Sequence, residues 1–123
     1  TINRILGFFE PHHQAQIRLL LGSVLKAVVS QRLVPGAQGG RVAALEVMIN
    51  TGTIYECIVD PKRTREIRDY MRKGRATYHT QTFDQHLYAL IKEQRVKQDD
   101  ALKYANNPDE LALKLSGLGA DDD

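Results

Sequence analysis

The sequence predicts an α+β fold, mostly α-helical, in which helices flank one β-hairpin. Apolar residues recur at spacings of three and four over most of the chain, which is the period of an amphipathic helix. That period is interrupted only between Arg32 and Ile49, where two strand-like runs enclose a glycine-rich turn. Proline and capping residues separate the helical runs from one another.

Composition limits the class of protein. The 123 residues suit one domain or two very small units, and 42% hydrophobic residues are enough for a folded core. A net charge of +2 gives little general attraction to nucleic acid. No apolar run reaches the roughly 18 residues of a membrane span, so membrane insertion is not expected. The single cysteine, Cys57, has no internal partner, and we therefore expect a cytoplasmic protein.

Two helices are predicted before the hairpin. Ile2, Ile5, Leu6 and Phe9 form one apolar helix face, and Pro11 ends this helix and begins the next. The second helix is predicted to continue to Val28, since its apolar residues keep helical spacing over three turns: Ile17, Leu20, Leu21, Val24, Leu25 and Val28. His12 and His13 stand at its start, and as neighbours we expect them to point apart and to bind no metal.

The predicted hairpin covers residues 30–49. A short strand, Ser30–Val34, is followed by a turn with glycines at 36, 39 and 40 and by a longer strand that ends at Ile49. Both faces of the second strand are apolar except at Glu46, which indicates a strand covered on both sides within a larger body. The glycine pair precedes a strand and not a helix, so a phosphate-binding loop is not predicted.

A short helix with a buried face is predicted next. Thr53 and Glu56 have the spacing of a capping box, and the helix should run to about Val59. Ile54, Cys57 and Ile58 share its apolar face. Cys57 is interpreted as a small core residue, because no basic residue or histidine lies close in sequence to lower its pKa.

The most basic segment, residues 62–73, is predicted to be a helix ended by Gly74. Ile67, Tyr70 and Met71 supply a narrow apolar face. Two interpretations of its charged face remain open. The face is solvated and contains ion pairs with Glu66 and Asp69, or it binds an acidic protein partner or a neighbouring subunit.

Three further helices complete the prediction. Thr82 and Gln85 form a capping box for a helix over 83–93, Asp99 and Asp100 begin a short helix to Ala105, and Asn107 caps a last helix to Leu115. Residues 116–123 are predicted to be disordered. His79 and His86 are interpreted as a loop and a helix-surface histidine, although an acid/base pair of either with a carboxylate stays open.

No catalytic, cofactor-binding or metal-binding residue is predicted. The chain contains no GxxxxGK[ST], no GxGxxG before a helix, no GxSxG, no CxxC and no HExxH. Charged side chains are plentiful, but spacing alone brings none of them together as a catalytic group.

Four segments occur in an order that resembles the C-terminal part of the twitching-motility ATPases of the PilT type, in the type II/IV secretion ATPase superfamily. They are TINRILGFFEPHHQAQIRLLLGSVLKAVVSQRLVP, GGRVAALEVMINT, QTFDQHLYALI and ALKYANNPDEL. The resemblance extends over roughly residues 1–115.

This resemblance implies a segment of a hexameric, ATP-driven type IV pilus motor that transmits motion and does not hydrolyse ATP by itself. It divides the chain into the end of a RecA-like core (1–52), a helical extension (53–115) and a tail (116–123). ATP and magnesium are expected for the full-length parent and not for this chain. The implied partners are further subunits of the ring and inner-membrane pilus assembly proteins. The implied location is cytoplasmic, peripheral to the inner membrane.

The resemblance also suggests site residues. In the relatives, the motif AIRNLIRE follows the strand. The aligned residues 53–60 of this chain keep the apolar face of the motif but differ from it on the polar face. The aligned residues singled out are Thr53, Ile54, Glu56, Cys57, Ile58 and Asp60. The resemblance suggests Arg41 and Glu46 for a subunit or domain contact, and the basic segment adds Arg65, Arg68 and Arg72 as interface candidates. For Arg41 and Glu46, ion pairing within the fold is an alternative account. The alternative function is a helical adaptor that binds an acidic protein through residues 62–75.

Overall fold

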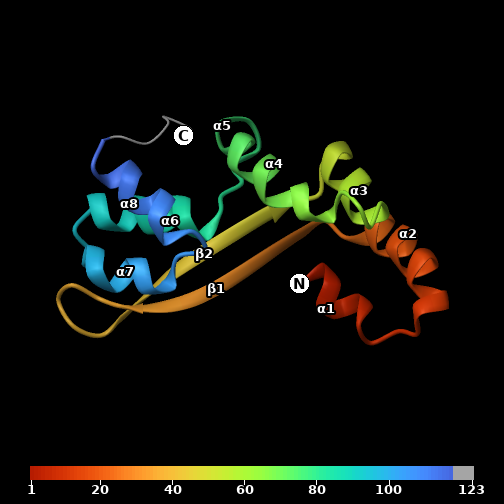
Figure 1. Cartoon of the computed structure of the whole chain (residues 1–123), viewed down its shortest axis with the longest axis horizontal. Coiled ribbons are helices and arrows are strands. Elements are labelled where there is room, and N and C mark those ends of the chain that lie inside the picture. Colours follow the sequence, from red (N-terminus) through yellow and green to blue (C-terminus); the bar gives the residue numbers. More distant parts are fainter. Residues whose placement is uncertain (118–123) are drawn as a thin grey trace.

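A computed structural model describes residues 1–117, and it confirms a mostly helical fold around one antiparallel hairpin (Figure 1). The predicted tail falls largely on residues 118–123, which lie outside the described residues. The α-helices are α1 (Ile2–Leu6), α2 (Gln14–Val24), α3 (Gly52–Val59), α4 (Ile67–Lys73), α5 (Arg75–Tyr78), α6 (Phe83–Lys92), α7 (Gln98–Tyr104) and α8 (Pro108–Leu115). The strands are β1 (Ala27–Pro35) and β2 (Arg41–Ile49), and two 3₁₀ turns, Pro11–His13 and Thr64–Glu66, precede α2 and α4.

The hairpin connects two groups of helices. β1 and β2 pair antiparallel from Ala27 opposite Ile49 to Pro35 opposite Arg41. Near the turn, α6, α7 and α8 cover the hairpin, and at the other end lie α1, α2, α3 and α4 (Figure 1). Each group has its own apolar cluster. One contains Val34, Ala44, Phe83, Leu87, Leu90, Val96, Ala101 and Leu111, and the other contains Ile2, Leu6, Met48, Ile54, Ile58 and Met71.

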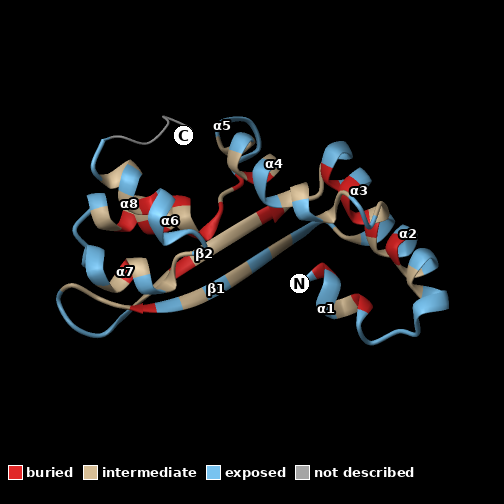
Figure 2. Cartoon of the chain, viewed as in Figure 1, coloured by how far each residue is buried: buried red, intermediate tan, exposed pale blue. Residues whose placement is uncertain are grey.

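Both clusters use the same face of the hairpin. Side chains alternate along a strand, so Ala44 and Met48 of β2 point to one face and both are buried. On the opposite face β2 is half-buried, whereas Val29 of β1 is 63% exposed and Leu33 is 50% exposed (Figure 2). Within residues 1–117 the helices thus bury one face only, and cover of the second face by a larger body stays a prediction.

The two edges of the hairpin also differ. Along the outer edge of β2, the Val47 and Gln81 backbones exchange hydrogen bonds of 2.9 and 3.1 Å, and the Leu45 N–H donates to His86 Nδ1 at 2.8 Å. In the described part of the chain, β1 pairs with β2 alone. The outer edge of β1 is thus available for pairing with a further strand.

The first two helices are shorter than the sequence predicts. α1 ends at Leu6, and Phe9 lies beyond it with 41% of its surface exposed. α2 ends at Val24 because Leu25 adopts an extended backbone, and the chain then enters β1, where Val28 pairs with Met48. The Asn50 side-chain amide donates to the carbonyls of Gly22 and Leu25, which satisfies the end of α2. Strand pairing therefore overrides helical spacing at Val28, and β1 begins three residues before its predicted start.

The cap of α3 is also corrected. The Thr51 hydroxyl accepts a hydrogen bond from the Ile54 N–H at 3.3 Å, whereas Thr53 lies inside the first turn. The predicted capping box of Thr53 and Glu56 is therefore wrong, because the helix already begins at Gly52, one residue before Thr53. The predicted end of α3 near Val59 is confirmed.

The basic helix starts later than predicted, at Ile67, after a 3₁₀ turn. Gly74 ends it without a left-handed conformation, because its φ is −84°. A Cβ on Gly74 would lie 3.1 Å from both Thr80 Oγ1 and the Tyr70 carbonyl oxygen. A side chain at residue 74 would crowd these two atoms. The glycine therefore allows Thr80 and Tyr70 to lie close to the backbone, and it is not needed for a left-handed conformation. His79, with φ of 60°, reverses the chain after α5.

The caps of the last helices are as predicted. Thr82 and Gln85 form both hydrogen bonds of a capping box at α6. Asn107 caps α8 through its side-chain oxygen, and Pro108 occupies the first helical position. The Asp84 carboxylate accepts from the backbone N–H groups of Asn106 and Asn107, which fixes the start of α8 beside α6.

Candidate functional site, helix α3 and the arginines around it

Helix α3 presents a buried face and an exposed face, as its sequence predicts. Ile54, Cys57 and Ile58 are buried at 3% exposure or less, whereas Thr53 and Glu56 are exposed. Burial raises the pKa of the Cys57 thiol, so this side chain stays protonated at neutral pH and acts as a core residue. The side chains that α3 exposes include Thr53, Glu56 and Tyr55, with Tyr55 37% exposed.

A buried arginine fixes the end of α3. Arg18 of α2 is only 8% exposed, and its Nη1 donates to the Ile58 carbonyl oxygen and to Thr64 Oγ1, each at 2.9 Å. The Thr64 hydroxyl in turn donates to the carbonyl oxygen of Cys57 at 2.8 Å. Arg18 thus connects α2, the last turn of α3 and the segment that leads to α4.

Helices α2 and α3 also approach closely at a glycine. A Cβ on Gly22 would lie 2.9 Å from Tyr55 Cδ2 and 3.3 Å from Val59 Cγ2. Without a side chain at Gly22, the Tyr55 ring can pack onto the α2 backbone. Together with Arg18, this contact holds α2 and α3 as one unit.

Arg63 interacts with polar side chains of α3, of the 3₁₀ turn that follows and of α4. Its guanidinium contacts Glu56 at 3.1 Å and Glu66 at 3.2 Å and donates to the Tyr70 hydroxyl at 3.4 Å. The bond to Glu56 is the largest of several effects that raise the Arg63 pKa further above its usual value. The exposed acid of α3 is therefore tied to the segment before α4.

Glu46 lies on the buried face of the hairpin, between the two apolar clusters. Its side chain is 16% exposed, and its carboxylate is 3.9 Å from Arg68 Nε. Burial raises the Glu46 pKa, and the positive charges of Arg68 and Arg32 oppose this rise. Arg32 stacks on Phe83 with its guanidinium carbon 4.0 Å from the ring centroid and donates to the Tyr104 carbonyl oxygen. Glu46, the charged residue within the apolar run of β2, is thus ion-paired within the fold.

The structure brings together only part of the predicted interface set. Glu46 and Arg68 form an ion pair, and Arg65 lines the same pocket of about 330 Å³, together with Ile2 and Met71. Arg72 pairs with Asp69 at 3.6 Å. Arg41 stands at the start of β2, five residues from Glu46, or about 17 Å along an extended strand. Arg41 therefore belongs to a different surface.

These contacts bear on the two open interpretations of the basic segment. Arg63, Arg68 and Arg72 all form ion pairs with acids of this chain. Arg65, Lys62 and Lys73 are exposed. Three of these basic residues are thus paired within the fold and three are exposed, so ion pairing accounts for half of the segment.

His86 is a half-buried polar residue of α6 beside the edge of β2. Its Nδ1 accepts the hydrogen bond from the Leu45 N–H at 2.8 Å, which joins α6 to the edge of β2. Desolvation lowers the His86 pKa, so the neutral ring is favoured. His86 is therefore a structural acceptor, and His79 lies exposed at the end of α5.

The turn before α2 departs from the sequence expectation. The rings of His12 and His13 do not point apart; their centroids lie 4.0 Å from each other. The 3₁₀ turn at Pro11–His13 causes this approach, since the sequence expectation assumed an α-helix that starts at Pro11.

Sequence reasoning missed Arg18, Gly22 and Arg32. Arg18 was not detectable, because a charged residue next to apolar positions such as Ile17 is ordinary in an amphipathic helix. Gly22 and Arg32 gave no signal either, since their contacts with Tyr55 and Phe83 join residues 33 and 51 positions apart.

Comparison of the fold with solved structures defines the class. The chain superposes on the pilus retraction motor PilT with bound ADP with a TM-score of 0.71 and 32% identity, over 90% of this chain and 30% of that one. The ATPase DotB of Legionella pneumophila matches with a TM-score of 0.62 at 15% identity, over 94% of this chain and 28% of that one, which is a likeness of fold. The chain thus has the fold of part of the pilus retraction motor PilT.

Sequence comparison finds relatives among the type IV pilus ATPases. Over its whole length the chain is 33% identical to the type IV pilus ATPase PilU of Pseudomonas aeruginosa, and over 89% it is 31% identical to PilT of that organism. It is 30% identical over 92% of its length to a twitching motility protein of Neisseria gonorrhoeae. No protein-family model matches the chain. Sequence and fold together confirm the resemblance to PilT-like ATPases.

The chain spans about a third of the length of each of these relatives. Among the helices of residues 1–117, none combines the length and apolarity that crossing a bilayer requires.

Proposed function

We propose that this chain is the C-terminal segment of a hexameric, ATP-driven type IV pilus motor and that it transmits nucleotide-driven motion rather than hydrolysing ATP by itself. The observation that carries the proposal is the joint match of sequence and fold to PilT, 32% identity at a TM-score of 0.71, over 90% of the chain. The solved PilT structure contains ADP. ATP and magnesium then act in the parent protein, at motifs that this sequence lacks.

The uncovered face of the hairpin supports a place within a larger ATPase domain. Val29 and Leu33 expose apolar surface, and β1 has an outer edge without a partner among residues 1–117. Burying such a face against further strands or helices is favourable by about 25 cal/mol per Å². In this proposal residues 1–52 complete a RecA-like core, and residues 53–115 form the helical extension.

The mechanical part of the proposal rests on α2 and α3. Arg18 binds the last turn of α3, and Tyr55 packs on Gly22, so a displacement of α2 carries α3 with it. The exposed residues Thr53 and Glu56 then move as part of a rigid surface. We propose that this surface delivers motion to a neighbouring subunit or to inner-membrane pilus assembly proteins, on the cytoplasmic side of that membrane.

A chimera tests the proposal. The matching third of Pseudomonas aeruginosa PilT is replaced by this chain, and the chimera is assayed for ATP hydrolysis and for twitching in a strain without its own PilT. We expect hydrolysis and twitching from the chimera and no hydrolysis from the isolated chain. Turnover by the isolated chain would contradict the placement of the site upstream.

A second pair of chimeras tests the transmitting surface. Thr53→Lys with Glu56→Lys alters the exposed face of α3, whereas Lys103→Glu alters an exposed residue of α7 as a matched control. We expect the α3 variant to keep ATP hydrolysis and lose twitching and the control to keep both. Equal motility of the two chimeras, or loss of hydrolysis together with motility, would argue against a transmitting role for α3.

A further inference from the structure

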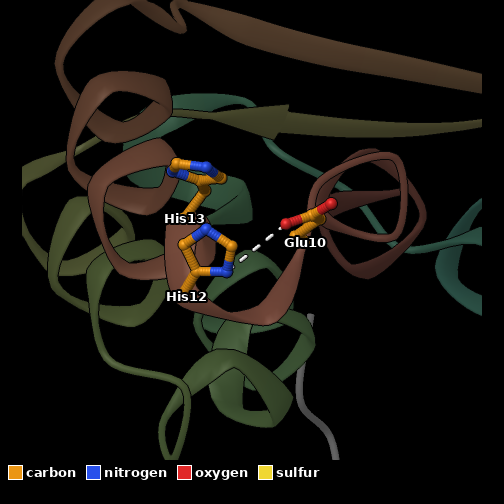
Figure 3. Close-up of side chains that lie close together, drawn as sticks. All are labelled: Glu10, His12 and His13. Atoms are coloured by element: carbon orange, nitrogen blue, oxygen red, sulfur yellow. Dashed lines mark ion pairs between the residues drawn. The ribbon is translucent and has the colours of Figure 1, made fainter.

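Three metal-binding side chains gather in the turn between α1 and α2. Glu10, His12 and His13 each offer a ligand atom, and these atoms lie within 4.8 Å of one another. His12 Nδ1 is 3.5 Å from Glu10 Oε2. Figure 3 shows the His12 ring directed at the Glu10 carboxylate, with the His13 ring beside it. Neither the transmitting surface of α3 nor the ion pairs of α4 involve these residues.

The backbone of this turn is already fixed. The His13 N–H donates to the Glu10 carbonyl oxygen at 2.9 Å, and Pro11 restricts the turn between them. The Gln14 side-chain amide donates to the carbonyls of Leu6 and Phe9 at 3.2 and 3.3 Å, so it closes the preceding loop. The three side chains therefore need only side-chain rotation, and no backbone ordering, to converge.

The required rotation is small. Two ligands that lie about 2.1 Å from one tetrahedral ion are about 3.4 Å apart. The observed separations of up to 4.8 Å therefore have to shorten by at most about 1.4 Å, which is within the range of exposed rotamers. All three residues are exposed, so water can fill the remaining coordination positions.

The chemistry of the donors selects the class of ion. Two imidazoles and one carboxylate suit zinc and similar divalent transition ions, whereas magnesium and calcium prefer all-oxygen sites.

We propose that Glu10, His12 and His13 form a binding site for one Zn²⁺-class divalent ion, with three protein ligands and water in the open position. The bound ion fixes the turn between α1 and α2 and stabilises the folded chain by an amount that grows with the logarithm of the free Zn²⁺ concentration once this exceeds Kd. The proposal does not depend on the pilus-motor function, because its readout is metal binding and not motility or ATP hydrolysis.

Titration calorimetry of the untagged full chain with ZnCl₂ tests the site. We expect one Zn²⁺ per chain, no competition from MgCl₂, and weaker binding on acidification, because imidazole must be neutral to bind a metal. Co²⁺ as a probe should give a visible d–d band that Zn²⁺ removes. Absence of one-to-one Zn²⁺ binding would overturn the proposal.

Variants identify the ligands. His12→Ala, His13→Ala and Glu10→Gln should each lower the Zn²⁺ affinity by about tenfold or more. The matched control is His79→Asn, which removes an exposed imidazole elsewhere and keeps a residue type that tolerates the left-handed backbone at this position. An equal loss in His79→Asn, or unchanged binding in the His12→Ala, His13→Ala double variant, would overturn the proposal.

A measurement on the unaltered chain gives an independent answer. Diethyl pyrocarbonate modifies exposed imidazoles, and mass spectrometry locates the modified residues. We expect Zn²⁺ to protect His12 and His13 and to leave the modification of His79 unchanged. Equal modification of His12 and His13 with and without Zn²⁺ would exclude them as ligands.

Discussion

Arg18 donates a hydrogen bond from Nη1 to the backbone oxygen of Ile58 at 2.9 Å, across 40 residues of sequence. The Arg18 guanidinium therefore lies in the interface of α2 and α3. It provides a hydrogen-bond donor for a carbonyl oxygen at the end of α3 that has no partner within the helix. The side chain is 8% exposed, so water replaces it poorly. The contact explains how two short helices form one unit.

Arg18→Met should destabilise the chain by about 2 kcal/mol. The substitution keeps most of the side-chain volume but leaves the Ile58 carbonyl and the Thr64 hydroxyl without their charged donor, a loss worth about 1.5–3 kcal/mol. Urea unfolding followed by circular dichroism measures the change. Arg65→Met, at an exposed position, is the control and should change stability by less than about 0.5 kcal/mol. Equal effects of the two variants would show that the Arg18 contacts add nothing.

Gly22→Ala should cost about 1–3 kcal/mol, because the new methyl group overlaps the Tyr55 ring at 2.9 Å. In a Tyr55→Leu background the same change should cost less, since the ring is absent. A double-mutant cycle of unfolding free energies measures this coupling. Additive effects would mean that the helices separate to accept the methyl group without strain.

Glu46→Gln should raise stability at neutral pH by about 0.5 kcal/mol. The Glu46 pKa is raised in the folded state, so its proton is held more tightly there than in the unfolded chain. The resulting stability is present below the unfolded glutamate pKa of about 4.3 and is lost as the pH rises through the folded pKa. Unfolding at pH 7.5 and at pH 4 should therefore show a gain from Glu46→Gln that shrinks on acidification. A gain independent of pH would contradict the desolvation argument.

His86 should lower the stability of the fold as the pH falls, whereas Glu46 lowers it as the pH rises. The His86 pKa is lowered in the folded state, so its contribution is complete above the unfolded histidine pKa of about 6.5 and is lost as the pH falls through the folded value. Protonation also removes the acceptor that receives the Leu45 N–H. We expect His86→Asn to reduce the stability difference between pH 7.5 and pH 5.5.

His79→Asn is the control for this measurement and should keep the wild-type difference, since His79 is exposed. Hydrogen exchange at the Leu45 amide gives a local readout, and it should accelerate on acidification relative to the Val47 amide, whose acceptor is the Gln81 carbonyl. An unchanged ratio of the two exchange rates would argue against loss of the His86 acceptor.

The local signals in the sequence were reliable where one short-range interaction decides the structure. The capping box of Thr82 and Gln85 and the Asn107 cap before Pro108 both form as predicted. Each depends on side chains within three residues of the backbone groups that they satisfy. The same reasoning chose Thr53 over Thr51, because Thr53 with Glu56 has the spacing of a capping box, whereas the third residue after Thr51 is Ile54.

The sequence by itself determined the helical character, the single hairpin, the core position of Cys57 and the resemblance to PilT-like ATPases, because periodicity, turn residues and ordered motifs are local properties of the chain. Only the tertiary structure decided that Val28 enters a strand, that Glu46 pairs with Arg68, that Arg18 reaches Ile58 and that His12 and His13 lie side by side with Glu10. Strand pairing, burial and side-chain approach between distant segments decide those features, and a one-dimensional pattern records none of these distances.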